Sequence, residues 1–264
     1  MALLRIFLAP PDSTHMPTPW PLRLINFGAA FLLVALIFYF SFYQLNYHWN
    51  WVSIYQYRQK FLNGWITTIL ISFAALGLST GIGLFFALAQ RSRWLALRYF
   101  SKIYIEVVRG TPLLVQILIF FYVVADALHV GNRYLVGTLT LAFFSGAYIS
   151  EIIRAGIESV GKSQLESAKA IGLTRAQTYR FVIFPQALRQ TLPPLAGQFV
   201  SLIKDSSLLS IISISEFTLN AREVNSSTFS TLESYIPLAI GYLLLTLPIS
   251  MWTRHLERRH RYDT

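Results

Sequence analysis

The sequence predicts an all-α integral membrane protein with six transmembrane helices. Two observations lead to this fold class. Only 13% of the 264 residues are charged, about half the share typical of soluble domains, and 54% are hydrophobic. In addition, six apolar runs are long enough, or nearly so, to cross a hydrocarbon core of roughly 30 Å, for which about 20 helical residues suffice. The chain has no cysteine, which excludes disulfide scaffolds, iron–sulfur clusters and cysteine nucleophiles.

The six runs are separated by more polar segments, the longest of which follows the fourth run. Neither of the first two runs contains a charged residue. The fifth differs, because it opens at Pro193 and Pro194 and holds Lys204 and Asp205. We predict membrane spans at residues 24–42, 61–89, 103–124, 135–153, 191–214 and 236–252.

A proline-rich segment precedes the first run. Five of the chain's 11 prolines fall within the first 21 residues, a composition that favours an irregular tail. We therefore expect a tail at residues 1–23, a membrane helix at 24–45, and a second short tail at 258–264.

The net charge of +10 is distributed unevenly along the chain. If the N-terminus is inside, the cytoplasmic segments hold 17 of the 22 Lys and Arg residues and the outer segments hold four. Cytoplasmic loops of membrane proteins carry such an excess of Lys and Arg. The distribution predicts that both termini are cytoplasmic, and it gives no reason to expect nucleic acid as a partner.

The polar stretch at residues 154–189 has the marks of two short helices. Residues 163–166 and 174–177 each have the spacing of a capping box, in which two side chains satisfy backbone amides at a helix start. Gly172, between them, can take the left-handed conformation that ends a helix. Pro185 is expected to limit the second helix, because proline disfavours helix at the preceding residue. The pattern predicts a shaped docking element.

Several motifs in this stretch and around it point to a known family. Residues 166–172 (Glu-Ser-Ala-Lys-Ala-Ile-Gly), followed after nine residues by 182–185 (Val-Ile-Phe-Pro), resemble the "EAA" loop of ABC-importer permeases. About three quarters of the chain resembles the polar amino-acid branch of that family. The motifs that carry this resemblance are residues 109–116 (Arg-Gly-Thr-Pro-Leu-Leu-Val-Gln), Ala147 and Tyr148 with Glu151 and Arg154, residues 185–188 (Pro-Gln-Ala-Leu) and residues 204–208 (Lys-Asp-Ser-Ser-Leu).

The chain departs from the family pattern at a few positions. Ser167 replaces the first Ala of the loop motif and Phe184 the usual Leu, changes that are conservative in polarity or size. Gly197 stands where the branch often has Asn, which bears on the substrate. The first run adds a span to the five that the branch often has.

The resemblance implies a type I ABC importer-like fold, with a permease domain at residues 61–257 and a cytoplasmic coupling loop at 155–189. The loop would dock on an ATP-binding cassette subunit. Leu165, Ala168 and Ile171 form an apolar stripe on one helix face that suits such docking. The alternative is an amphipathic hairpin lying on the membrane. The docking residues that the motif implies are Glu166, Ser167, Ala168, Gly172, Arg175 and Pro185.

The function implied is that of the permease subunit of an ATP-driven importer for polar or charged amino acids in the bacterial cytoplasmic (inner) membrane. A second permease subunit, identical or paralogous, and a periplasmic or lipid-anchored solute-binding protein are the other implied partners. Residues 156–163 (Gly-Ile-Glu-Ser-Val-Gly-Lys-Ser) have the spacing of a phosphate-binding loop, but they follow an apolar membrane run and not the β-strand that such a loop requires. We expect no enzyme activity here and ATP with magnesium on the partner ATPase. His129 and His255 have no partner at ligand spacing, and we expect no metal site.

Charges inside a membrane span indicate function by default. A zwitterionic amino acid needs an anion for its ammonium group and donors or a cation for its carboxylate, which Lys204, Asp205, Ser206 and Ser207 could supply. The alternative is that these residues pair with other helices and hold the fold or a subunit interface. Gln116 and Tyr148 are further candidates for the substrate path, or polar groups satisfied inside the bundle.

Two carboxylate–arginine pairs stand three residues apart, Glu106 with Arg109 and Glu151 with Arg154. Residues at this spacing are neighbours on a helix surface. They are expected to form local ion pairs at the interface, and the alternative is an inner gate.

Small residues also recur within the second run. Gly77 and Gly81 have the small-xxx-small spacing that lets membrane helices approach closely, and Ser79 and Gly83 continue the small face. We expect this face to pack within the chain, with a subunit interface as the alternative.

Three other functions remain open from the sequence. An importer permease for an opine or a polyamine would share the same motifs. An ion-coupled carrier would usually show repeated halves and more intramembrane carboxylates. A membrane-embedded enzyme would need a catalytic motif. His-Glu-x-x-His does not occur, and the Gly-x-Ser-x-Gly spacing at residues 77–81 lies inside the second apolar run, not at the strand-to-helix turn that such a nucleophile needs.

Overall fold

The computed structural model describes residues 19–43 and 47–260, which fall into two units, Met1–Trp49 and Asn50–Thr264. All regular elements of these described residues are helical. Residues 1–18 and 261–264 of the two predicted tails lie outside the described residues, as do residues 44–45 of the predicted first helix.

The first unit contains one long helix, α2 (Trp20–Tyr43), and none of its residues is buried. Two of its polar side chains donate to carbonyls of their own helix, Asn26 to Leu22 and Ser41 to Ile37, both at 2.8 Å. A helix that is apolar on all sides belongs in lipid or inside a larger assembly. It is long and apolar enough to cross a membrane, as predicted.

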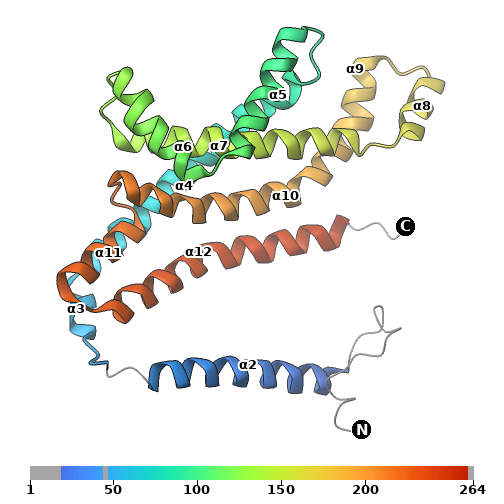
Figure 1. The fold of residues 1–264 in the computed structure, drawn as a ribbon. Helices are drawn as coiled ribbons and strands as arrows, with labels where there is room; N and C mark the ends of the chain where they lie inside the picture. The colour runs from blue at the N-terminus through green and yellow to red at the C-terminus, as the bar shows by residue number, and fades with distance from the viewer. Residues whose placement is uncertain (1–18, 44–46, 261–264) are drawn as a thin grey trace. The chain divides into compact units, whose positions relative to one another are not determined.

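The second unit is a bundle in which α7 and α10 run side by side, with the short helices α8 and α9 beyond the end of α7 (Figure 1). We call the end of the unit that holds α8 and α9 the loop end. The elements are α3 (Trp51–Gln56), α4 (Arg58–Ala89), α5 (Leu95–Gly110), α6 (Leu113–Ile119), η1 (Phe120–Ala125), α7 (Arg133–Glu158), α8 (Lys162–Ala170), α9 (Arg175–Thr178), η2 (Tyr179–Ile183), α10 (Phe184–Asp205), η3 (Ser206–Ile212), α11 (Phe217–Thr228) and α12 (Thr231–His260).

Five described helices are long and apolar enough to cross a membrane, and six spans result if a bent pair counts as one. The bent pair is Leu95–Gly110 with Leu113–Ala125, whose axes differ by 110°. The prediction of one continuous helix at residues 103–124 was therefore wrong in shape. Proline disfavours helix at the residue before it, and Thr111, before Pro112, has an extended backbone (φ −119°, ψ 145°).

The fifth predicted span also differs from the structure. It begins far earlier than residue 191, because α9, η2, α10 and η3 run on as one candidate span, Arg175–Ile212. Pro185 does not end the helix that precedes it. It lies in the first turn of α10, directly after the π-helical turn η2, and the helix continues through it.

Close packing of α4 against α7 forms the centre of the unit. A Cβ atom added to Gly83 would lie 2.4 Å from Ile149 Cγ2, and one added to Gly146 would lie 2.6 Å from Ile82 Cγ2. Each helix therefore offers a glycine to an isoleucine of the other, and the backbones can approach closely.

The predicted small face of α4 is only partly right. Ser79 and Gly83 are buried, as expected for a face that packs within the chain. Gly77 and Gly81 are not, and no other described atom lies within 4 Å of a Cβ at either position. They lie on the opposite, exposed side of the helix.

A polar cluster holds the other end of the unit, away from the loop end. The fully buried Glu216 carboxylate accepts from the backbone N–H of Thr218 (2.8 Å) and Leu219 (2.7 Å) and so caps α11. The Tyr242 hydroxyl of α12 donates to the same carboxylate at 3.1 Å. Burial raises the pKa of Glu216 above its usual value, and the backbone amides oppose this rise. The cluster fastens α11 to α12.

Candidate functional site

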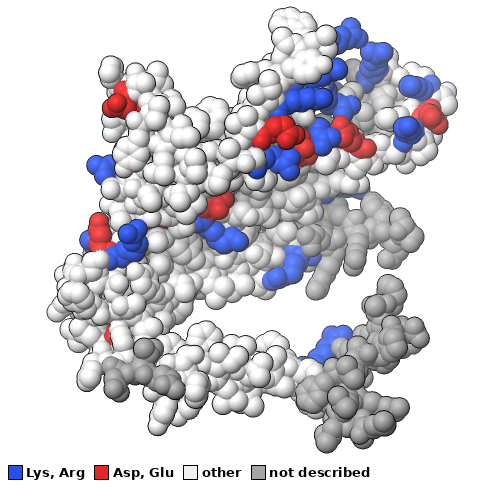
Figure 2. Space-filling view, in the orientation of Figure 1, with Lys and Arg blue, Asp and Glu red and all other residues white. Residues whose placement is uncertain are grey.

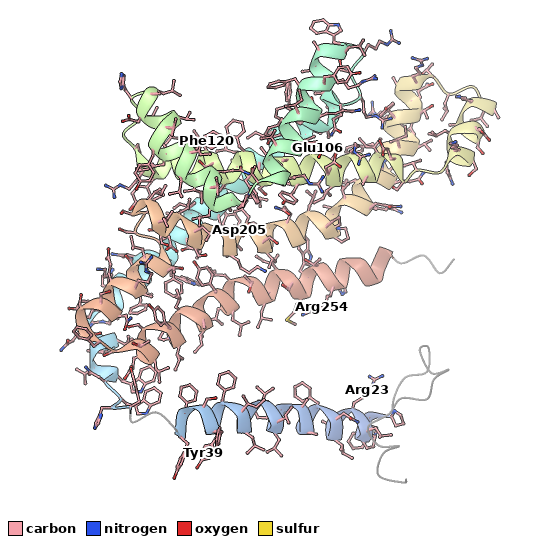
Figure 3. The ribbon with its side chains drawn as sticks, in the orientation of Figure 1. Arg23, Tyr39, Glu106, Phe120, Asp205 and Arg254 are labelled. Carbon is pink, nitrogen blue, oxygen red and sulfur yellow. The ribbon has the colours of Figure 1, made fainter. Side chains whose placement is uncertain are left out.

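Lys204 and Asp205 close the last turn of α10, beside the 3-10 segment η3 (Figure 3). Lys204 is exposed and Asp205 is half-buried. Among the described residues, no ion pair or hydrogen bond reaches either side chain. The two charges are therefore available to a ligand or to another subunit.

The two hydroxyls that follow are already used by their own helix. Ser206 Oγ is buried and donates to the Ile203 carbonyl at 2.7 Å, and Ser207 Oγ donates to the Lys204 carbonyl at 2.7 Å. Each oxygen still has lone pairs to accept with. As donors for a substrate carboxylate, both would first have to leave these bonds.

Gln116 stabilises the break between α5 and α6. Its amide nitrogen lies 2.7 Å from the Val108 carbonyl, 2.8 Å from Thr111 Oγ1 and 3.2 Å from the Thr111 carbonyl. Thr111 Oγ1 in turn donates to the Val107 carbonyl at 2.8 Å. The interrupted helix leaves carbonyls without their usual partners, and these side chains supply donors to two of them. The Gln116 amide nitrogen is thus committed to the backbone.

Tyr148 lies between an aromatic and a cationic neighbour. Its ring is 5.1 Å from that of Phe144, and the Arg109 guanidinium lies over it at 5.4 Å. Arg109 also reaches Glu151, with 3.5 Å between nitrogen and oxygen. At the break in the third span, Arg109 therefore contacts both Tyr148 and Glu151 of α7, and the sequence could not place Arg109 against that helix.

Of the two predicted local ion pairs, one forms as expected. Arg154 donates to Glu151 through Nε and Nη2, both at 2.9 Å. No ion pair joins Glu106 to Arg109 in the described chain, and that prediction was wrong. Arg109 is the last but one residue of α5, and its side chain turns across to α7.

The Glu151–Arg154 pair belongs to a wider network at the loop end. Arg154 also contacts Glu158 at 2.5 Å, Glu158 lies 3.8 Å from Arg91, and Gln90 donates to Glu151 at 3.3 Å. A cavity of about 430 Å³ opens here between the ends of α4, α5 and α7. Sequence reasoning missed Gln90 and Glu158. The spacing of Glu158, four residues after Arg154, was a signal that could have found it.

Gly172 ends α8 with a closed turn. Its φ is +77°, in the left-handed region. The Gly172 N–H donates to the Lys169 carbonyl and the Leu173 N–H to the Ala168 carbonyl, both at 3.0 Å. These two bonds form the Schellman motif, which uses the last free carbonyls of a helix. The predicted glycine corner is confirmed.

Of the two predicted capping boxes, one forms and one does not. At α9, the Gln177 N–H donates to Thr174 Oγ1 at 3.3 Å and the Thr174 N–H to Gln177 Oε1 at 2.9 Å, as predicted. At α8, the N-cap is Gly161 and no side chain caps it, so the box predicted at residues 163–166 was wrong. The helix starts before Ser163, because the Gly161 carbonyl accepts the first turn's bonds.

The predicted apolar stripe of α8 does not face outward as a whole. Ala168 is only 2% exposed, and Leu165 packs on the small core formed by Val160, Ile183 and Ala187. Ile171, at the helix end, is 76% exposed. Because two of its three members hold the loop together, the stripe as a whole is not the docking surface.

The remaining docking residues lie on the outer side of the loop. Glu166, Ser167, Gly172 and Arg175 are exposed, whereas Pro185 is half-buried. No ion pair or side-chain hydrogen bond engages Glu166, Lys169 or Arg175 in the described part of the chain. The loop is internally fastened and presents unpaired charges outward. No group of His, Asp or Glu suited to hold a metal occurs among the described residues.

The chain matches known protein families and structures. Residues 79–262 match the family model described as "Binding-protein-dependent transport system inner membrane component". The chain is 35% identical over 199 residues to the probable glutamine ABC transporter permease protein GlnM of Bacillus subtilis (strain 168), covering 75% of this chain and 92% of the relative. It is 37% identical over 216 residues to the glutamine transport system permease protein GlnP of Escherichia coli (strain K12), covering 80% and 97%.

Solved structures give the same result. A chain from a crystal structure of an amino acid ABC transporter with histidines is 36% identical, with a TM-score of 0.75, and covers 81% of this chain and 100% of its own length. A chain of the MetNI methionine ABC transporter in an inward-facing conformation has a TM-score of 0.61 and covers 75% of this chain and 96% of its own. At 13% identity, the second likeness supports the fold alone.

Proposed function

Because the chain belongs to the family of inner membrane components of binding-protein-dependent transport systems, we propose that it is the permease subunit of an ATP-driven importer of polar or charged amino acids. It has the all-helical membrane fold of type I ABC importer permeases. The names of its relatives, which include glutamine permeases of two bacteria, support an amino acid as the substrate.

The carboxylate of Asp205 is the proposed contact for the ammonium group of that substrate. It lies within a candidate membrane span and has no partner among the described residues. Lys204, on the adjacent position, is available to the substrate carboxylate. Groups left unpaired at membrane depth are expensive to keep, and they are typical of substrate pathways.

The observation that carries the proposal is the continuous helical connection from the coupling loop to Asp205. One candidate span, Arg175–Ile212, starts directly after the corner at Gly172 and contains Lys204 and Asp205. A force applied to α8 and α9 is therefore carried along one element to the charged pair. This connection suits a transporter in which conformational changes of a cytoplasmic partner alter access to a site in the membrane.

The exposed residues of the loop are the proposed docking surface for the ATP-binding cassette subunit. Glu166, Arg175 and Ile171 supply an acid, a base and an apolar contact at the corner that Gly172 fixes. We propose that ATP, with magnesium, is bound and hydrolysed by that partner, and that this chain has no enzyme activity of its own. Both termini are then cytoplasmic, in agreement with the distribution of Lys and Arg.

Two permease subunits, identical or paralogous, form the proposed pathway, and a solute-binding protein delivers the substrate from outside. Closure of the ATPase dimer would draw the two coupling loops together and open the pathway outward, and hydrolysis would reset it. An opine or a polyamine importer would use the same coupling parts, so substrate identity must be measured.

The experiment that tests the substrate class is copurification. The full chain, expressed with its coding neighbours, is isolated together with any solute-binding protein, and the ligand of that protein is identified by mass spectrometry. We expect a polar or charged amino acid that the purified binding protein takes up again after unfolding and refolding. An opine or a polyamine as the sole ligand would contradict the amino-acid proposal and leave the importer assignment in place.

A further inference from the structure

Three basic residues surround the start of α5 at the loop end. Arg93 lies in the turn that leads into the helix, and Arg98 and Lys102, one helical turn apart, share a face of it. Figure 2 shows Lys and Arg side chains gathered over the part of the unit that holds α5, α8 and α9. We call Arg93, Arg98 and Lys102 the α5 cationic surface.

None of the carboxylates in the described part of the chain forms an ion pair with these three residues. The other arginines nearby do form ion pairs, since Arg91 pairs with Glu158, and Arg109 and Arg154 pair with Glu151. Among the side chains of Arg93, Arg98 and Lys102, Arg98 donates a hydrogen bond from Nη2 to the Ser92 carbonyl at 2.9 Å. The Nε of Arg98 is buried without a described partner. Lys102 also lines the cavity that holds Glu106, Glu151 and Glu158, but none of these carboxylates forms an ion pair with it. The surface therefore keeps positive charge that an external anion can neutralise.

Large apolar side chains stand beside the cations on the same helix. Leu95, Tyr99 and Ile103 follow one another at intervals of four residues, next to the Arg98–Lys102 face, and all three are exposed. Trp94, at the first position before the helix, is 77% exposed. Aromatic residues of this kind settle at the membrane interface, and long basic side chains reach from there to the headgroups.

We propose that the α5 cationic surface binds the headgroups of anionic phospholipids, with Leu95, Tyr99 and Ile103 against the acyl chains. A soluble protein partner could pair with the cations, but it would not contact the neighbouring apolar stripe, which would still face lipid. A phospholipid satisfies both, because its phosphate and its chains are separated in the way the basic and apolar stripes are. Basic clusters at the end of a membrane helix attract anionic lipid in general.

The position of the surface gives such binding a consequence for the rest of the unit. α5 carries these cations at one end and Arg109, the contact of Glu151 on α7, at the other. A lipid bound at the start of α5 holds that end at the headgroup level, and so fixes how the broken span enters the membrane.

The test measures lipid retention by the full chain. The purified protein is equilibrated in micelles with equal amounts of phosphatidylglycerol and phosphatidylcholine that have the same acyl chains, and retained lipids are counted by native mass spectrometry. We expect a preference for phosphatidylglycerol that weakens as salt is raised. Replacing all three residues, Arg93→Gln, Arg98→Gln and Lys102→Gln, should lower the preference by about tenfold or more.

Two further variants keep the result interpretable. Lys102→Gln alone removes an exposed side chain without an ion-pair partner, so it should fold normally and lower the preference by about fivefold. The matched control, Lys162→Gln with Lys169→Gln and Arg175→Gln, removes the same charge from the same end of the unit, away from the apolar stripe. We expect it to retain the preference.

Equal loss in the control would show that net charge alone attracts the lipid, and would overturn the proposal. An unchanged preference in the triple and single variants would do the same. If the triple variant keeps its lipids but no longer copurifies with the ATP-binding subunit, the surface serves that protein partner and the lipid proposal is wrong.

Discussion

Arg109 of α5 lies 3.5 Å from Glu151 of α7, although Glu106 precedes it by three residues on its own helix. The helix ends one residue later, at Gly110, so the guanidinium is free to leave the helix surface. Glu151 thereby holds two arginines and the amide of Gln90. The Glu151 carboxylate thus joins the end of α5 to α7, beside the contact of Arg109 with the Tyr148 ring.

The first prediction concerns that carboxylate. Glu151→Gln removes the charge that compensates Arg109 and Arg154, and it should lower the free energy of unfolding by about 1–2 kcal/mol, because the pairs are partly exposed and partly screened. For a protein of this size we expect a fall in melting temperature of roughly 2–8 °C in detergent. Glu106→Gln, the control on the neighbouring helix, loses no ion pair that the described structure contains and should leave the temperature unchanged. Equal falls in both variants would refute the assignment.

Gln116 offers a second test at the same break. Gln116→Leu leaves the Val108 carbonyl without a donor and should destabilise the unit by about 1–3 kcal/mol. Gln59→Leu, on α4, removes an exposed amide whose hydrogen bond in the described structure goes to Asn63 on the same helix, and it should change little. Thermal unfolding of both variants in the same detergent decides the matter, and a harmless Gln116→Leu would mean that the break needs no such support.

Gly172 tests the coupling loop. Gly172→Asp forces a side chain into the left-handed region and places a charge on the corner, at an order of 1 kcal/mol of local strain. Space is not limiting, since no described atom lies within 4 Å of a Cβ there. In vesicles with the partner subunits, ATP hydrolysis should continue while uptake falls severalfold. Gly161→Ala, at an ordinary φ of −60°, is the control and should remain coupled. Normal uptake by Gly172→Asp would argue against the docking role of this corner.

Asp205 tests the substrate path. Asp205→Asn keeps the size of the side chain and removes its charge, so the concentration of substrate for half-maximal uptake should rise by about tenfold or more, the scale of one lost charge-assisted contact. The yield and melting temperature of the protein should stay near those of the original chain. Asp126→Asn, an exposed carboxylate after the π-helical segment η1, is the control. A variant that fails only through loss of folded protein would favour a structural role.

The helix contact between α4 and α7 gives a fifth prediction. Gly83→Ala brings a methyl group within 2.4 Å of Ile149 Cγ2 and should lower stability by about 1–3 kcal/mol. Gly77→Ala, six residues earlier, meets open space and gains helix propensity, so its melting temperature should be unchanged or slightly higher. The reverse order in a thermal unfolding series would contradict the packing described above.

The sequence could predict the candidate spans because length and apolar composition define them, and the structure has five among the described residues, or six if the bent pair counts as one. A run of about 20 apolar residues needs a membrane whatever its neighbours are. The shape of the third span could not be predicted, since residues 103–124 contain Pro112 and yet read as one apolar run. Likewise, the sequence around Pro185 does not show whether the proline ends a helix or lies within one. In the structure, the π-helical turn η2 leads directly into α10.

For the candidate site, too, the sequence could predict some features and not others. Local features were readable, such as Gly172 at a helix end and Glu151 with Arg154 on one face, because both partners lie within one helical turn. Contacts between helices were not. Arg109 reaches α7, and Ala168 is buried, because of how the elements pack, and no spacing in one sequence records that.

The most direct test of the proposed function is uptake by the reconstituted complex. The full chain is placed in vesicles with the ATP-binding subunit inside and the solute-binding protein outside, and labelled glutamine and other polar amino acids are supplied in turn. Accumulation of one of them against its gradient, dependent on internal ATP and on the binding protein, is the expected result. Uptake that continues without ATP and collapses when a protonophore is added would contradict it.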